Sequence, residues 1–521
     1  MPKALFLLAA LGFCGESAAA QTPLPPHPTL VVMITIDGFR EDYLTRFGPQ
    51  LTGGLARLTK GGAWFTNAHQ DHGITETAPG HASLLSGRFP RSTGIMANRI
   101  GVADQNAPLL GFSGVLGASP SRFQGTELFD WIKAADSKSR ALSVSAKDRG
   151  AILPIGKSKQ QIYWYPGDGE FTTSKYYADS LPAWVRKFND RLMPQSYAGK
   201  SWTPLLPDSA YKEPDSVSIE GGGKDYVFPH VMPSDPDQAA SLVRATPFMD
   251  ELVVAMALDG VSALDLGRGP TTDLLAVSLS ANDAVSHRLG PASKEEHDQV
   301  LRVDRTIGVF LDSLFKLRDQ SKIIVVLSAD HGFTPIPELA AADVNPHPTR
   351  ASLEPALAEA RKRLADAKMD TAAIDVDQQI VLLDRSKFQR AKISAESILQ
   401  TFETAAKTIP GIARLDRFSN LAKDSATDPI ARRWSHQFPQ GTNVEMVATL
   451  TPGSLWGNFL VASHGSPYDY DSNVPIIFYG SGIPANRYND FVRTVDIAPT
   501  LAAMLGVKPL EKLDGVPLSL K

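Results

Sequence analysis

Three short apolar runs, each leading to an aspartate, constrain the fold of this chain more than any other feature. The runs cover residues 30–36 before Asp37, 274–280 before Asp283 and 323–329 before Asp330. Each run is continuous rather than alternating, which is typical of strands buried on both faces of a parallel sheet covered by helices. The sequence therefore predicts an α/β fold with a largely parallel central sheet and helices on both faces.

The same three aspartates predict where a ligand binds. Sheets of this kind bind ligands beyond the carboxyl ends of their strands, so Asp37, Asp283 and Asp330 are expected to meet at one edge. The alternative is that each aspartate only caps the helix that follows it. Repetition of the pattern at three strand ends favours a shared site.

The N-terminus has the pattern of a secretory signal peptide. Lys3 precedes an apolar run over residues 4–13, and small residues follow at 17–20, so we expect residues 1–20 to be removed after Ala20. A buried helix or a membrane anchor is disfavoured, because the run is short and residues 21–28 are rich in proline. The mature protein is then exported, periplasmic or secreted, with no stable membrane span. Cys14, the one cysteine of the chain, is removed with this segment.

Histidines accompany the aspartates. His287 follows Asp283 by four residues, His331 follows Asp330 directly, and His464 lies in a loop before a further apolar run. A lone loop histidine is usually a surface residue, but these three share their placement with strand-end carboxylates. Without thiolates, carboxylate and imidazole groups are what zinc-like ions can use, so the sequence predicts a two-metal site.

A candidate nucleophile lies in the stretch 73–87. Thr77 precedes Pro79 and a run of small residues, which predicts a helix start with the hydroxyl at its N-terminus, where an anion is favoured. The alternative is a simple threonine cap. Threonine is a weak nucleophile unless a metal or base activates it, and the predicted metal site would supply that activation.

These motifs, in this order, resemble the alkaline phosphatase superfamily, and within it the PafA-like phosphomonoesterases with a threonine nucleophile. The resemblance implies an alkaline phosphatase-like fold with two Zn²⁺ ions. One ion would be held by Asp283, His287 and His464. The other would be held by Asp37, Asp330, His331 and the Thr77 oxygen. His81 is expected to be structural.

Two further segments bear on the substrate. Asn98 matches a family asparagine that hydrogen-bonds a phosphoryl oxygen, and Lys147 with Arg149 resembles the pair that binds phosphate in the PafA-like group. Without the resemblance, the Lys–Asp–Arg run at residues 147–149 would be interpreted as a solvent-exposed charged loop. Two divalent ions, three aspartates and a Thr77 alkoxide sum to zero charge, so a phosphomonoester dianion would use both added cations. We therefore expect an alkaline phosphatase that cleaves small phosphate monoesters through a phosphothreonine intermediate.

The rest of the chain reads as additions to one catalytic domain over residues 28–521. Residues 163–226 are rich in aromatic residues, proline and glycine, and predict an inserted lid, although such clusters often only pack. Residues 335–455 predict a small α+β subdomain, with helices near 353–368 and 394–408 and a strand near 379–383. The net charge of −4, with both signs interspersed, gives no basic stripe for nucleic acid. The oligomeric state is left open.

Three alternatives differ in chemistry. A phosphodiesterase or nucleotide pyrophosphatase of the same superfamily shares the metal ligands. A sulfatase is disfavoured, because there is no cysteine near Thr77 to become the modified nucleophile. A non-catalytic binding protein would leave the placement of Thr77 without a purpose.

Overall fold

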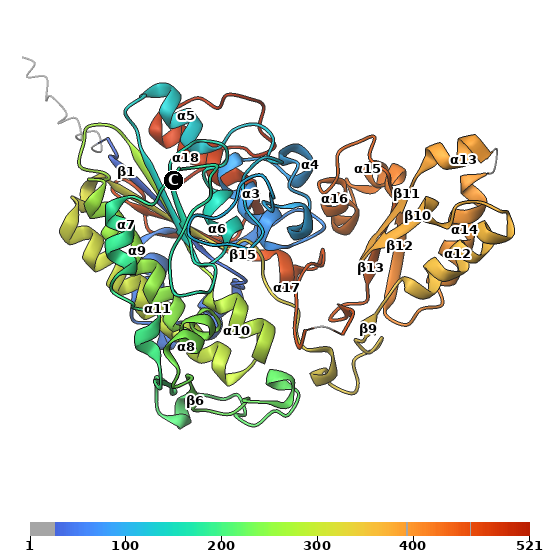
Figure 1. Cartoon of the computed structure of the whole chain (residues 1–521), viewed down its shortest axis with the longest axis horizontal. Helices are drawn as coiled ribbons and strands as arrows, with labels where there is room; N and C mark the ends of the chain where they lie inside the picture. The colour runs from blue at the N-terminus through green and yellow to red at the C-terminus, as the bar shows by residue number, and fades with distance from the viewer. Residues whose placement is uncertain (1–26, 392–393, 459, 521) are drawn as a thin grey trace, which may run out of the picture.

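The protein forms a large α/β body from which a smaller unit projects (Figure 1). The structure is a computed structural model that describes residues 27–391, 394–458 and 460–520. The predicted signal peptide lies outside the described residues. Within them, no helix combines the length and apolarity needed to cross a membrane.

A nine-stranded sheet, counted over the described residues, forms the centre of the large body. Its strands in spatial order are β16 (Asn486–Tyr488), β2 (Ala63–His69), β15 (Asn473–Gly480), β8 (Ile323–Ser328), β1 (Leu30–Ile36), β7 (Asp273–Leu279), β3 (Ala141–Ser145) and β4 (Gln161–Trp164), while β17 (Val492–Arg493) pairs with β2. The strands β8, β1, β7, β3 and β4 run parallel. β15 runs antiparallel to both of its neighbours. The prediction of a largely parallel sheet is therefore confirmed.

Strand β1 shows why the apolar runs are continuous. Every residue of β1 is buried, and alternate side chains enter different cores. Val32 and Ile34 belong to one hydrophobic cluster, whereas Val31 and Met33 belong to the other. Because side chains alternate across a strand, a strand covered on both faces needs apolar residues at every position.

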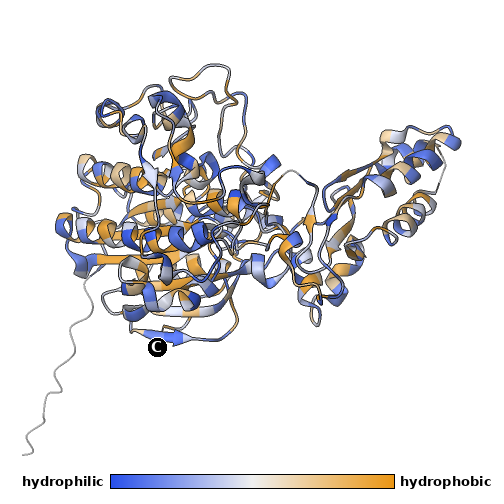
Figure 2. Cartoon of the chain, turned by 90° about the horizontal axis from the view of Figure 1, so that it is seen from below, coloured by the Kyte–Doolittle hydropathy of each residue, from blue (hydrophilic) through white to orange (hydrophobic). Residues whose placement is uncertain are grey.

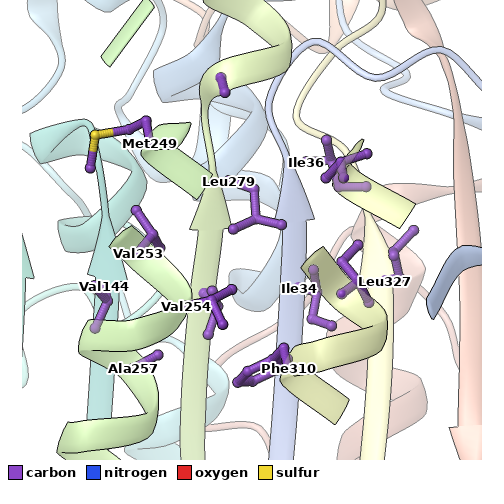
Figure 3. Close-up of a cluster of buried hydrophobic side chains, with 14 of the residues drawn as sticks. Ile34, Ile36, Val144, Met249, Val253, Val254, Ala257, Leu279, Phe310 and Leu327 are labelled. Carbon is purple, nitrogen blue, oxygen red and sulfur yellow. The ribbon is translucent and has the colours of Figure 1, made fainter. Parts of the chain in front are cut away.

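Helices cover both faces of the sheet, as predicted. On one face lie α2 (Gly54–Gly61), α9 (Phe248–Ala263), α10 (Ala281–Leu289) and α11 (Lys294–Leu317). On the other lie α3 (Thr77–Ser86), α5 (Leu128–Ala135), α6 (Asp148–Ile152) and α18 (Ile497–Leu505). Figure 3 shows the first face, where Val253 and Val254 of α9 and Phe310 of α11 lie over the strands. Figure 2 shows the apolar sheet inside the more polar helices.

The projecting unit contains the predicted α+β subdomain, here called the inserted unit (residues 350–456). Its antiparallel sheet has the order β10 (Ile374–Asp377), β11 (Ile380–Leu383), β13 (Val444–Leu450) and β12 (Ile412–Arg417). The helices α12 (Glu354–Asp366) and α14 (Ala395–Ala406) pack together on one face of it. The remaining helices are α13 (Arg385–Ala391), α15 (Leu421–Asp424) and α16 (Pro429–Ser435). Short strands β9 (Arg350–Ala351) and β14 (Leu455–Trp456) pair at its base.

The aromatic segment 163–226 mostly packs against the large body. Its first two residues belong to β4, and α7 (Ala183–Asn189) is its helix. Phe171, Trp202 and Tyr211 are buried in the same cluster as α9 and α11. The far end approaches the carboxyl edge of the sheet, where Ile219 packs against Phe333. Packing is therefore the main role of these aromatic residues, and only the end of the segment lies near the candidate site.

Candidate metal centre and nucleophile

The three strand-end aspartates meet because their strands are neighbours in register. β1 lies between β7 and β8, with Thr35 opposite both Ser278 and Ser328. Asp37 directly follows β1 and Asp330 follows β8 after one residue, while Asp283 lies in the first turn of α10, which follows β7. The aspartates therefore share one carboxyl edge, and each is almost fully buried.

The first group of candidate ligands is Asp283, His287 and His464. Asp283 Oδ1 lies 3.3 Å from His287 Nε2 and 3.5 Å from His464 Nε2. The four-residue spacing on α10 brings Asp283 and His287 to one face of the helix, as the sequence predicts. His464 comes from the loop before β15, on the far side of the site.

The second group is centred on His331. His331 Nε2 lies 3.4 Å from Asp37 Oδ1, 3.4 Å from Thr77 Oγ1 and 3.7 Å from Asp330 Oδ2. Asp283 Oδ1 is also near, at 3.9 Å. Asp37, Asp283 and His331 form a second set of candidate ligands, so Asp283 belongs to both groups. Asp330 lies beside this set, and its Oδ1 accepts hydrogen bonds from the backbone N–H groups of Gly38 and His331.

The three histidines are held in one tautomer. The Nδ1 atoms of His287, His331 and His464 lie 2.8–2.9 Å from the carbonyl oxygens of Ala462, Gly332 and Thr75. A carbonyl oxygen can only accept, so each Nδ1 carries a proton and donates it. The Nε2 atom of each ring is then the one that can bind a metal when it carries no proton, which is the arrangement seen for metal-binding histidine.

The polar atoms of the centre fit divalent ions. The Oδ1 atoms of Asp37 and Asp283 are buried and accept no hydrogen bond, and their neighbours at 3.3–3.5 Å are histidine Nε2 atoms. Ligands about 2.1 Å from a tetrahedral zinc ion lie roughly 3.4 Å from one another. Four of the separations, at 3.3–3.5 Å, match that value, and those of Asp330 and Asp283 from His331 are somewhat longer, at 3.7 and 3.9 Å. The donors are nitrogen and oxygen, which suits zinc.

Thr77 is the first residue of α3, not its cap. The N-cap is Glu76, whose side chain makes no cap hydrogen bond. The Thr77 hydroxyl is buried and contacts His331 Nε2. The capping alternative therefore does not explain this threonine. His81, one turn later, contacts Asp330 Oδ2 and Ser278 Oγ at 3.0 Å, so it holds a candidate ligand in place.

The charges of the centre are coupled. Burial opposes ionisation of Asp283, but Lys147 and His287 outweigh it and hold its pKa well below the usual range. Burial also opposes the charged form of His331, yet Asp330 and Asp37 raise its pKa to about 9. Asp283 therefore stays ionised, and His331 must lose a proton when it binds a metal.

Lys147 and Arg149 lie beside the centre but have different partners. Lys147 precedes α6, and its Nζ lies 2.7 Å from Asp37 Oδ2 and 2.5 Å from Asp283 Oδ2. Arg149 is less engaged, since its nearest carboxylate, Asp148, is 3.6 Å away and its Nε makes no hydrogen bond. Arg149 is therefore free to bind an anion.

Asn98 is tied to the start of α3. Its Oδ1 accepts a hydrogen bond of 2.8 Å from the Ala78 N–H, and its own N–H donates to Glu76 Oε2 at 2.6 Å. Within the described part of the chain, Nδ2 of Asn98 makes no hydrogen bond. This N–H group is available beside Thr77.

The sequence did not predict several residues that support the centre. Asn282 donates to the backbone oxygens of Asp37 and Gly38, which ties α10 to the end of β1. The buried Asp471 accepts from Thr334 Oγ1 and from the Ser466 N–H, so it joins the loops that carry His331 and His464. Asn282 is adjacent to Asp283 and could have been considered, but nothing in the sequence around Asp471 indicates this role.

Comparison with known families and proteins agrees with this geometry. The family model described as type I phosphodiesterase / nucleotide pyrophosphatase matches residues 31–407. The chain is 29% identical to alkaline phosphatase PafA of Elizabethkingia meningoseptica, covering 99% of this chain and 98% of that protein. It is also 29% identical to alkaline phosphatase PhoV of Synechococcus elongatus, covering 97% of each.

Comparison with solved structures also shows similarity to an alkaline phosphatase. The crystal structure of wild-type alkaline phosphatase PafA matches with a TM-score of 0.86 and 28% identity, covering 95% of this chain and 98% of that one. Murine ectonucleotide pyrophosphatase / phosphodiesterase 5 matches with a TM-score of 0.52 and 15% identity, covering 92% of this chain and 96% of that one. The second match shows a shared fold alone.

Proposed function

Because the chain belongs to the type I phosphodiesterase / nucleotide pyrophosphatase family of the alkaline phosphatase superfamily, we propose that it is an exported two-zinc phosphomonoesterase with Thr77 as its nucleophile. It is an alkaline phosphatase, a hydrolase of phosphoric monoesters, like the full-length relatives that it matches. Small phosphate esters are its substrates. Export rests on the signal-peptide pattern of residues 1–20.

The observation that carries the choice of a monoester is the pair of cations beside the centre. Two divalent ions would balance Asp37, Asp283, Asp330 and an ionised Thr77. Lys147 and Arg149 then remain to balance the two charges of a monoester dianion. A diester carries a single charge and one fewer free oxygen, so the second cation would add little.

The donor set supports zinc. Asp283, His287 and His464 would hold one ion, and Asp37, Asp330, His331 and Thr77 would hold the other. When bound, such ions lower the pKa of a coordinated hydroxyl and stabilise charge that develops on phosphorus-bound oxygens.

The chain's own residues bind and orient the ester. Arg149 and the Asn98 Nδ2 group donate hydrogen bonds to the phosphoryl oxygens, which positions phosphorus near Thr77 Oγ1. The Thr77 hydroxyl gives up its proton and its oxygen forms a bond to phosphorus as the ester P–O bond breaks, and the departing oxygen takes up one proton to give the alcohol. Water then forms a bond to phosphorus as the bond to Thr77 breaks, a proton of that water returns to the Thr77 oxygen, and phosphate leaves.

The experiment that tests this function compares a monoester and a diester with the same aryl leaving group. The proposal expects a higher kcat/KM for the monoester, and a higher value for the diester would favour the phosphodiesterase alternative. The variant Thr77→Ala should lose turnover and phosphoprotein formation while its melting temperature stays close to that of the wild type. Full activity in that variant would refute covalent catalysis by Thr77.

A phosphodiesterase remains the second candidate because of one specific observation. The matching family model carries the phosphodiesterase description, and human ectonucleotide pyrophosphatase/phosphodiesterase family member 1 is 24% identical over 60% of this chain. That relative, however, is covered over only 24% of its length. The alkaline phosphatases match over nearly their full length, which favours the monoester.

A further inference from the structure

One buried side chain of the inserted unit contacts both segments that lead into the candidate site. Gln437 follows α16 and is fully buried. Its Oε1 accepts a hydrogen bond of 2.8 Å from the Ile74 N–H, and its Nε2 donates one of 2.6 Å to the Met96 carbonyl. Ile74 precedes Thr77 by three residues, and Met96 precedes Asn98 by two.

Hydrophobic contacts around Gln437 involve the same two segments. Ile74 and Met96 pack into a hydrophobic cluster made mainly by the inserted unit, including Trp434 of α16 and Val447 of β13. Trp434 lies so close to Gly73 that a Cβ atom there would be 2.4 Å from the indole ring. The inserted unit therefore makes a close-fitting contact with the loop before Thr77.

An ion-pair network anchors α16 to the same loop. Arg432 donates from Nε and Nη2 to the buried Asp71, at 3.0–3.1 Å, and His436 Nδ1 donates to the Asp71 carbonyl at 2.7 Å. Burial opposes ionisation of Asp71, but His436 and Arg432 outweigh it and lower its pKa to about 2. The position of α16 relative to this loop is thus fixed by charge as well as by packing.

We propose that Gln437 is a positioning residue that sets the spacing between Thr77 and Asn98. Its two hydrogen bonds close a ring whose other side is made by Asn98 with Glu76 and Ala78. Opening this ring would let the Asn98 Nδ2 group move relative to Thr77, so one phosphoryl oxygen would lose its donor. The inference rests on the proposed function, because it assumes that Asn98 binds phosphate. The proposal goes further in one respect: the inserted unit would fix the position of the segment that carries Thr77 relative to the segment that carries Asn98.

The test is a double-mutant cycle with Gln437→Met and Asn98→Ala in the full chain. Methionine keeps the volume of glutamine but makes neither hydrogen bond. We expect Gln437→Met to lower kcat/KM for an aryl phosphate about 10-fold and to weaken inhibition by inorganic phosphate by a similar factor. In the Asn98→Ala background the same change should cost less than about 2-fold, since the donor that it positions is already gone.

An equal loss in both backgrounds would overturn the proposal, because a general structural role would not depend on Asn98. If Gln437→Met does not fold, Gln437→Glu replaces it in the cycle, since it keeps an acceptor for the Ile74 N–H and loses the donor to Met96. Thr449→Val is the matched control. It removes the buried hydrogen bond to Trp434 Nε1 inside the inserted unit and should lower the melting temperature without changing kcat/KM.

The cycle also separates the two proposals. A wild-type preference for diesters would reject the proposed function. The cycle run with that diester would still report whether Gln437 acts through Asn98.

Discussion

Replacing Arg149 by alanine should slow monoester hydrolysis far more than diester hydrolysis. Arg149 is the cleaner of the two cations to remove. Lys147 Nζ contacts Asp37 and Asp283, which are candidate metal ligands, so its loss would also change the centre. Among the residues that the structure describes, the carboxylate that pairs with Arg149 is that of Asp148, at 3.6 Å, so its removal breaks no short ion pair there.

The size of the effect follows from the environment of the guanidinium. A charge-assisted contact to a reacting group in a partly dry site is worth about 2–4 kcal/mol. The Arg149 side chain is 28% exposed, so water screens it and the lower part of that range applies. A loss of about 2–3 kcal/mol corresponds to roughly 30–150-fold in kcat/KM for the monoester. The diester lacks the second charge and should lose less than about 5-fold.

The assay measures kcat/KM for an aryl monoester and an aryl diester with the same leaving group. Lys157→Ala serves as a matched control, because Lys157 is an exposed cation eight residues further along the same segment. This control variant should leave kcat/KM unchanged for both the monoester and the diester. If Arg149→Ala lowers kcat/KM for both substrates by the same factor, the charge argument is wrong, and a phosphodiesterase becomes the better interpretation.

Three further predictions concern metals and protons. A chelator should abolish activity and zinc should restore it. Because the pKa of His331 is raised to about 9 and its proton must leave on binding, zinc affinity measured by dye competition should fall about 10-fold per pH unit below that value. A pH-independent affinity would contradict this. Burial lowers the pKa of His72 to about 3, so the unfolded chain binds a proton below pH 6.5 that the folded chain does not. The free energy of unfolding should therefore decrease as the pH is lowered, and His72 should account for a decrease of about 2 kcal/mol at pH 5. His72→Gln should flatten the pH dependence of the melting temperature, and parallel curves would refute that.

Much of the fold could be predicted from the sequence because the pattern is local. Buried parallel strands need apolar residues at consecutive positions, so β1, β7 and β8 could be recognised without any partner. The order and direction of the strands in the sheet could not be predicted in this way. β15 also contains a continuous buried run, from Val474 to Phe478, yet it runs antiparallel between β8 and β2. Strand direction depends on how the chain returns to the sheet, which single-strand composition does not record.

The candidate ligands could be found for a similar reason. Asp37, Asp283 and Asp330 stand at strand ends, and the helical spacing of Asp283 and His287 is local. A resemblance that spans five ordered motifs then supplied the roles that we propose for Asn98, Lys147 and Arg149. Residue type and spacing were sufficient, since strand ends of a parallel sheet meet at one edge.

Only the tertiary structure decided how these groups are held. The tautomers of His287, His331 and His464 depend on carbonyl groups of folded loops, and the short contacts of Lys147 join segments more than 100 residues apart. Gln437 meets Ile74 across 363 positions of sequence. Hydrogen bonds between distant segments leave no periodic pattern in the chain. The sequence by itself determined which chemical groups the site contains, whereas the fold decided their spacing, their protonation and their supports.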